Sequence, residues 1–124
     1  MGADLAYIGS AFIATEEARA IDAYKQAIVE GDSSHIVGSS LFTGIFGNYL
    51  RPSVAKAGLD PDNLPQGDAK AMNFVSRGSS EAKVWRDIWG SGQGIGAVAA
   101  VQSVADLVAR LQREYAEAKT RLCA

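Results

Sequence analysis

The sequence contains almost no cysteine or histidine, the residues from which disulfide frameworks and most zinc centres are built. One cysteine, Cys123, and one histidine, His35, occur in 124 residues. A single cysteine cannot form an internal disulfide, which fits a reducing compartment, and an isolated histidine does not make a zinc site. We therefore expect no metal site, no catalytic role for either residue, and a cytoplasmic location.

Long apolar runs and basic clusters are also missing. No apolar run approaches the roughly eighteen residues that a membrane-spanning helix needs. Twelve Lys and Arg residues stand against fourteen Asp and Glu residues, which gives a formal net charge of -2. A footprint on a nucleic-acid backbone requires clustered basic side chains. The chain is therefore expected to contact neither a membrane nor nucleic acid.

The most informative stretch that is present is residues 1–15. Residues 5–8 form a short apolar run between Gly2 and Gly9, which is typical of a strand buried on both faces of a parallel sheet. Gly9 lets the backbone approach a ligand, and the hydroxyl of Ser10 can donate a hydrogen bond. This pattern fits a phosphate-binding turn at a helix start, although a Gly-Ser pair at a strand end is more often an ordinary turn.

A helix is predicted over residues 16–30. Thr15 stands at its N-cap, and Ile21, Tyr24 and Ile28 recur at helical spacing, so this stripe is expected to pack on a sheet. The opposite side is expected to be a solvated face: Arg19, Asp22, Lys25 and Glu30.

Residues 31–79 predict an irregular covering segment. One brief strand is expected before residue 50, and a short helix is expected from Pro52 to residue 57, with Gly58 at C′. A turn is predicted at residues 60–63. Residues 64–79 show neither helical nor strand periodicity and are predicted to form a surface loop.

Two helices joined by a glycine-rich loop are predicted over residues 80–124. The first ends at Gly90 and places four residues on one face, which we expect to be core, with stacking on an aromatic ligand as the alternative: Val84, Trp85, Ile88 and Trp89. The last helix is capped by Ser103 and carries an apolar stripe. The loop over residues 90–96 is not a Rossmann turn, because no strand precedes it, and it is either a hinge or a close approach to a ligand.

The motifs at residues 2–15, 42–44, 47–50, 58–65 and 85–96 stand in the order, and resemble the sequence, of the C-terminal third of the flavin-dependent nitronate monooxygenases, also called 2-nitropropane dioxygenases. The family fold is an FMN-binding TIM barrel, which needs about 250 residues. The resemblance implies an α/β fold class: one partial domain over residues 1–124 that is a C-terminal barrel fragment, mostly helical with little strand when taken alone. Residues 1–30 would be the last barrel strand and helix, and the remainder a helical C-terminal extension.

The resemblance also implies where the cofactor binds. Gly9, Ser10 and Ala11 match the segment that holds the FMN phosphate, and Ser91, Gly92 and Gln93 are candidates for the flavin or substrate pocket. The family's catalytic histidine belongs to a part that precedes residue 1, and His35 does not match it. No catalytic residue is therefore expected in this chain.

The function implied by the resemblance is oxidation of alkyl nitronates with O2 by a complete FMN enzyme. The chain alone is expected to be catalytically incompetent, and to need the missing N-terminal barrel or self-association. Two alternatives stay open at this stage. One is a non-catalytic helical interaction module derived from the family, and the other is a relative acting as an NAD(P)H:quinone-type flavin reductase.

Overall fold

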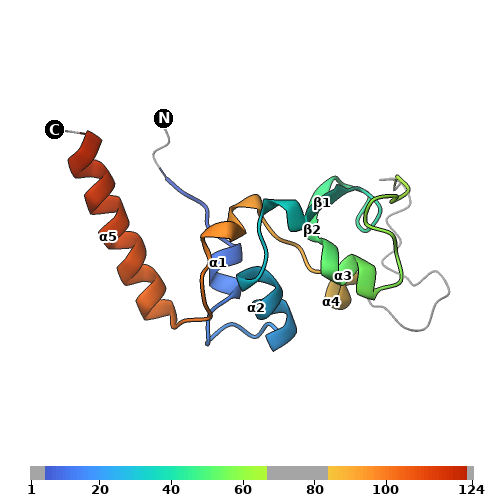
Figure 1. Ribbon diagram of the computed structural model, residues 1–124, viewed down its shortest axis with the longest axis horizontal. Coiled ribbons are helices and arrows are strands. Elements are labelled where there is room, and N and C mark those ends of the chain that lie inside the picture. The colour runs from blue at the N-terminus through green and yellow to red at the C-terminus, as the bar shows by residue number, and fades with distance from the viewer. Residues whose placement is uncertain (1–4, 67–83, 123–124) are drawn as a thin grey trace.

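The computed structural model describes residues 5–66 and 84–122 (Figure 1). Short helices dominate these residues, together with one two-stranded sheet. The elements in chain order are α1 (Ser10–Ile13), α2 (Asp22–Val29), a 3-10 turn (Ser33–His35), β1 (Ile36–Ser39), β2 (Gly47–Leu50), α3 (Arg51–Lys56), α4 (Val84–Asp87), a second 3-10 turn (Gln93–Ala97) and α5 (Val104–Leu122). Figure 1 shows α5 extending away from the other elements at one end.

Residues 5–8 do not form the predicted buried strand. Leu5 is 91% exposed and Tyr7 is fully exposed, and in the described part of the chain no strand lies beside them. A strand needs backbone partners on a neighbouring strand, and the sheet of this chain is made by β1 and β2 instead. The predicted strand is therefore wrong for the chain taken alone.

The helix predicted over residues 16–30 is also shorter, because α2 begins only at Asp22. Thr15 is not its N-cap: the Thr15 hydroxyl donates to the Phe12 carbonyl at 2.8 Å, and its backbone pairs with Gln102. Lys25 is buried rather than solvated, and its Nζ donates to the Glu16 carbonyl at 3.2 Å. Residues 16–21, which were predicted to form the first turns of this helix, are therefore not helical, and Thr15 before them pairs with the distant residue Gln102.

The sheet is an antiparallel hairpin of β1 and β2, in which Ile36 pairs with Leu50 and Ser39 with Gly47. Only one brief strand was predicted here. The outer edge of β2 is joined by residues 89–91, because the Leu50 N–H donates to the Trp89 carbonyl at 2.8 Å and the Ser91 N–H donates to the Asn48 carbonyl at 3.1 Å. This pairing fixes the start of the glycine-rich loop beside the hairpin.

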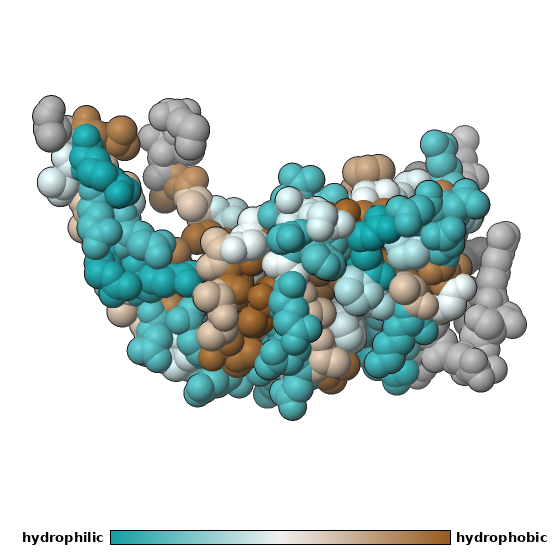
Figure 2. All heavy atoms as spheres, viewed as in Figure 1, coloured by the Kyte–Doolittle hydropathy of each residue, from teal (hydrophilic) through white to brown (hydrophobic). Residues whose placement is uncertain are grey.

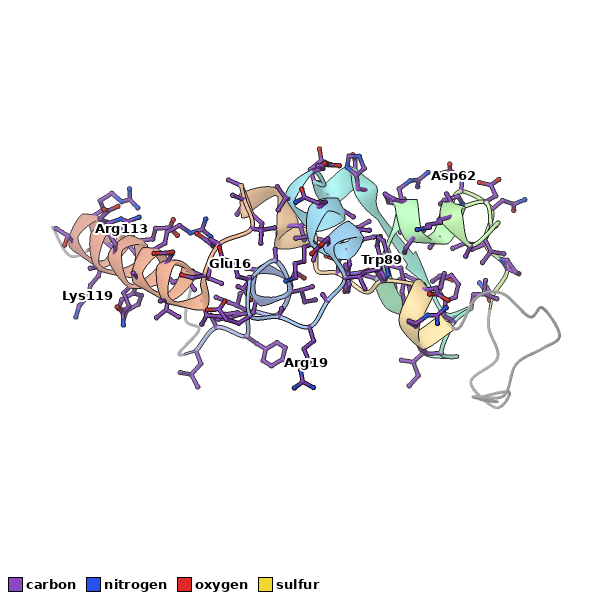
Figure 3. The ribbon with its side chains drawn as sticks, turned by 90° about the horizontal axis from the view of Figure 1, so that it is seen from below. Glu16, Arg19, Asp62, Trp89, Arg113 and Lys119 are labelled. Atoms are coloured by element: carbon purple, nitrogen blue, oxygen red, sulfur yellow. The ribbon has the colours of Figure 1, made fainter. Side chains whose placement is uncertain are left out.

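The core gathers one or two residues from almost every described segment. It consists of Ala14, Ile28, Leu50, Trp89, Ile95 and Val98. Trp89 is labelled in Figure 3. Its ring stacks on that of Tyr24 with centroids 5.1 Å apart, and the Tyr24 hydroxyl donates to the Gly90 carbonyl. The prediction that Trp89 is a core residue is confirmed. The predictions for the side chains of Val84 and Trp85 and for residues 67–83 lie outside the described residues.

Two helix ends agree with the sequence pattern. After α3, the Gly58 N–H donates to the Ala55 carbonyl and the Leu59 N–H donates to the Val54 carbonyl, which is the hydrogen-bond pattern of a Schellman cap. Before α5, the Ser103 hydroxyl accepts from the Asp106 N–H at 3.1 Å. Both caps depend on residues at most five positions apart, and both predictions are confirmed.

Replacing Gly58 with alanine is expected to lower the free energy of unfolding by about 1 kcal/mol. Gly58 has a φ of +80°, a conformation that a Cβ disfavours, although no atom lies within 4 Å of the position a Cβ would take. Gly94→Ala is the matched control, because its Cβ also enters open space and its φ is not positive. Equal urea-unfolding midpoints for the two variants would contradict this account.

Candidate functional site

The two segments that the sequence singled out separately lie against each other. The Gly92 N–H donates to the Ser10 Oγ at 2.8 Å, and the Ser91 hydroxyl lies 3.4 Å from the same oxygen. These residues are more than eighty positions apart in the chain. The structure therefore brings together a site made of Gly9, Ser10, Ser91 and Gly92.

The Ser10 hydroxyl is arranged to donate outward. A serine hydroxyl can accept two hydrogen bonds and donate one. The Gly92 N–H uses Ser10 as its acceptor, and the Ser91 hydroxyl lies within reach of both Ser10 and the Gly92 carbonyl, so the Ser10 proton can turn to another acceptor. The backbone N–H groups of Ser10 and Ala11 also have no acceptor among the described residues. Three donors at adjacent positions therefore remain for an external oxygen.

Local structure holds both halves of the site in place. The Gly9 carbonyl accepts from the N–H groups of Phe12 and Ile13 at 3.0 and 3.3 Å, which fixes the turn around Ser10. On the other side Ser91 is buried, and its N–H is bonded to Asn48. Gly9 is exposed, and a Cβ placed there would meet no atom within 4 Å. The site is thus held by the turn after Gly9 and by the buried Ser91, and it is open to solvent beside Gly9.

Gln93 and Ala11, two of the predicted site residues, do not bring a side-chain hydrogen bond to Ser10 within the described part of the chain, as Ser91 does. Gln93 is exposed at the start of the second 3-10 turn, and among the described residues no hydrogen bond joins it to Ser10. Ala11 contributes its N–H, but its side chain packs against the core. The glycine-rich loop therefore makes its hydrogen bonds to Ser10 from Ser91 and Gly92, while Ile95 of the same loop packs in the core beside Ala11 and Ala14.

Two clefts lie elsewhere, on either side of Lys56 and Trp89. The first, of about 390 Å³, also includes Arg86 and Asp87, and the second, of about 430 Å³, includes His35. Neither is lined by Ser10 or Ser91. No sequence pattern predicted these clefts, because α3 and Trp89 are distant in the chain and meet in the fold, where the Trp89 N–H donates to the Ser53 hydroxyl at 3.0 Å.

His35 is tied into a local turn. The Asp32 carboxylate accepts from the Ser34 hydroxyl at 2.6 Å and from the Ser34 N–H at 2.8 Å, and lies 3.1 Å from the His35 Nδ1. The Ser34 hydroxyl, together with the Ser34 N–H and His35, holds the pKa of Asp32 down to about 2. Within residues 5–66 and 84–122 no three His, Cys, Asp or Glu side chains gather as metal ligands would.

Among the described helices, none combines the length and the apolar content that crossing a membrane requires. No protein-family model, curated protein or solved structure matches this chain.

Proposed function

We propose that this chain is the C-terminal part of an FMN-dependent oxidoreductase of the nitronate monooxygenase kind. The observation that carries the proposal is the contact of Ser10 with Ser91 and Gly92, because the two segments matched to the flavin site by resemblance are distant in sequence and adjacent in space.

The residues present fit a phosphate group. Its oxygens accept hydrogen bonds, and the site offers the Ser10 hydroxyl together with the N–H groups of Ser10 and Ala11. Gly9 leaves open space beside these donors for a bulky anion. These three residues would therefore hold the phosphate of FMN, while Gly92 keeps the Ser10 hydroxyl oriented.

Bound FMN would supply the redox chemistry, taking electrons from an alkyl nitronate and passing them to O2. The role of this chain would be to anchor the FMN phosphate and to orient the cofactor. The Ser10 hydroxyl would donate to the phosphate, and the buried Ser91, which contacts the Ser10 hydroxyl, would hold the loop behind it. The catalytic base, the rest of the pocket and the substrate contacts would come from a barrel supplied outside these residues, and a cytoplasmic location remains a prediction.

The exposure of residues 5–8 favours the barrel origin. Leu5 and Tyr7 are almost completely exposed here, and apolar side chains of a strand are normally covered by neighbouring strands and helices. The same exposure also supports the second candidate, a non-catalytic interaction module that binds a partner through this apolar segment. Reading the DNA upstream of this coding sequence separates the two, since an in-frame barrel sequence favours the enzyme and a stop codon favours the module.

The phosphate site is tested by titrating FMN into the isotope-labelled chain and following backbone amide shifts. Shifts are expected at residues 9–11 and 92, with weak affinity because most of the pocket is absent. Gly9→Asp should abolish them, because it places a negative charge in open space without a clash. Gly94→Asp is the control, since that position is equally open but lies elsewhere in the loop. An unshifted spectrum at millimolar FMN would remove the site from this chain.

A further inference from the structure

Helix α5 carries an apolar seam that the rest of the described chain leaves largely uncovered. Six residues follow one another at alternating spacings of four and three: Val104, Val108, Leu111, Tyr115, Ala118 and Leu122. This alternation is the a/d repeat of a helix that packs along one other helix. Leu107 is the only buried residue of α5. Figure 2 shows the visible face of α5 as mostly hydrophilic, with apolar atoms at its far end.

The open part of this seam begins near Leu111. Closer to the body, Leu107 is buried, and the Arg110 side chain donates to the Ala97 carbonyl at 3.4 Å. Further out, Tyr115 is 72% exposed and Leu122 is 87% exposed. Helices in water draw most of their stability from packing an apolar face. A partner is therefore expected along residues 111–122.

We propose that this partner is a second copy of the same chain, whose α5 lies antiparallel over residues 111–122. In this register Tyr115 faces Ala118 of the second copy, and Leu111 faces Leu122 of the second copy. Each layer thus combines a large with a small side chain, or two leucines. A parallel pair would instead set Tyr115 on Tyr115 and Ala118 on Ala118, which overfills one layer and leaves a gap in the next.

The charges beside the seam favour the same arrangement. Glu114 flanks the seam and would meet Arg121 of the second copy, and two-fold symmetry repeats this pair. Gln112 would meet Lys119 in the same way, without repulsion. Figure 3 places Arg113 and Lys119 on opposite sides of α5, so charges that flank the seam can be changed separately from those that do not. The antiparallel arrangement also keeps the two bodies at opposite ends of the helix pair.

Sedimentation equilibrium of the full chain, with a reducing agent to keep Cys123 from cross-linking, tests the pairing. The average mass should rise with concentration from 13.0 kDa towards twice that value. Leu122→Ala should raise the dissociation constant roughly a hundredfold, because both symmetric halves lose a buried leucine. A mass of one chain at every soluble concentration would overturn the proposal.

Charge exchange tests the antiparallel register. Glu114→Arg should weaken the dimer roughly tenfold, since it opposes Arg121 twice, and adding Arg121→Glu should restore it. Glu117→Arg is the control, because it makes the same charge change on the side of α5 away from the seam. Rescue by Lys119→Glu in place of Arg121→Glu would indicate parallel helices and overturn the register. None of these measurements uses flavin, so their failure leaves the phosphate site untouched.

Discussion

Trp89→Ala is expected to lower the free energy of unfolding by about 3–5 kcal/mol, a large share of the roughly 5–15 kcal/mol that stabilises a small domain. The indole is 7% exposed and stacks on Tyr24. Removing it leaves a hole at the point where α2, the hairpin and the glycine-rich loop meet, and deprives the Tyr24 ring of its partner. The loss should appear as a lower urea midpoint in circular dichroism.

Two further variants make the Trp89 result interpretable. Trp89→Phe retains an aromatic ring and should cost clearly less than alanine, because most of the cavity stays filled. Phe46→Ala removes an aromatic side chain that is 73% exposed, so its effect should stay within about 0.5 kcal/mol. Should Trp89→Ala unfold at nearly the wild-type urea concentration, Trp89 would not be the centre of the core.

Ile95→Ala is the second large effect, with an expected loss of about 2–5 kcal/mol. Ile95 lies in the second 3-10 turn and is completely buried. Its Cδ1 lies so close to Gly31 that a Cβ there would approach to 2.9 Å, which shows how tightly this turn packs on the end of α2. Losing the side chain should loosen the glycine-rich segment as well as lower the global stability.

The matched control for Ile95 is Ile45→Ala, because the same atoms are removed from a residue that is 64% exposed. Its stability should change by less than about 0.5 kcal/mol. Amide hydrogen exchange adds a second readout, since Ile95→Ala should reduce protection of the Ser91 N–H, which is bonded to the Asn48 carbonyl. Equal decreases in the free energy of unfolding for Ile95→Ala and Ile45→Ala would contradict the stabilising effect of burying Ile95.

The candidate site was predictable in its parts but not as a whole. The sequence pointed to Gly9 and Ser10 by their chemistry, and to Ser91 and Gly92 by resemblance and glycine content. That the Gly92 N–H donates to the Ser10 hydroxyl depends on two segments meeting across the fold. The order of residues along the chain carries no information on such a contact.

Features that depend on neighbours within one or two turns could be predicted from the order of the amino acids alone. The glycine cap at Gly58, the Ser103 cap of α5 and the turn in which the Asp62 N–H donates to the Asp60 side chain all follow from residues a few positions apart. In each case the backbone conformation and the hydrogen-bond partner belong to the same short segment.

The conformations of residues 5–8 and of Thr15 depend instead on segments that are distant in the sequence. An apolar run becomes a strand when another strand supplies backbone partners, and none does so within the described residues. Thr15 could have capped a helix, but its backbone pairs with Gln102, and the Glu17 carboxylate accepts from the Val104 N–H at the start of α5. Long-range hydrogen bonds outweighed a local preference of about 1 kcal/mol, because they also bury surface between distant segments.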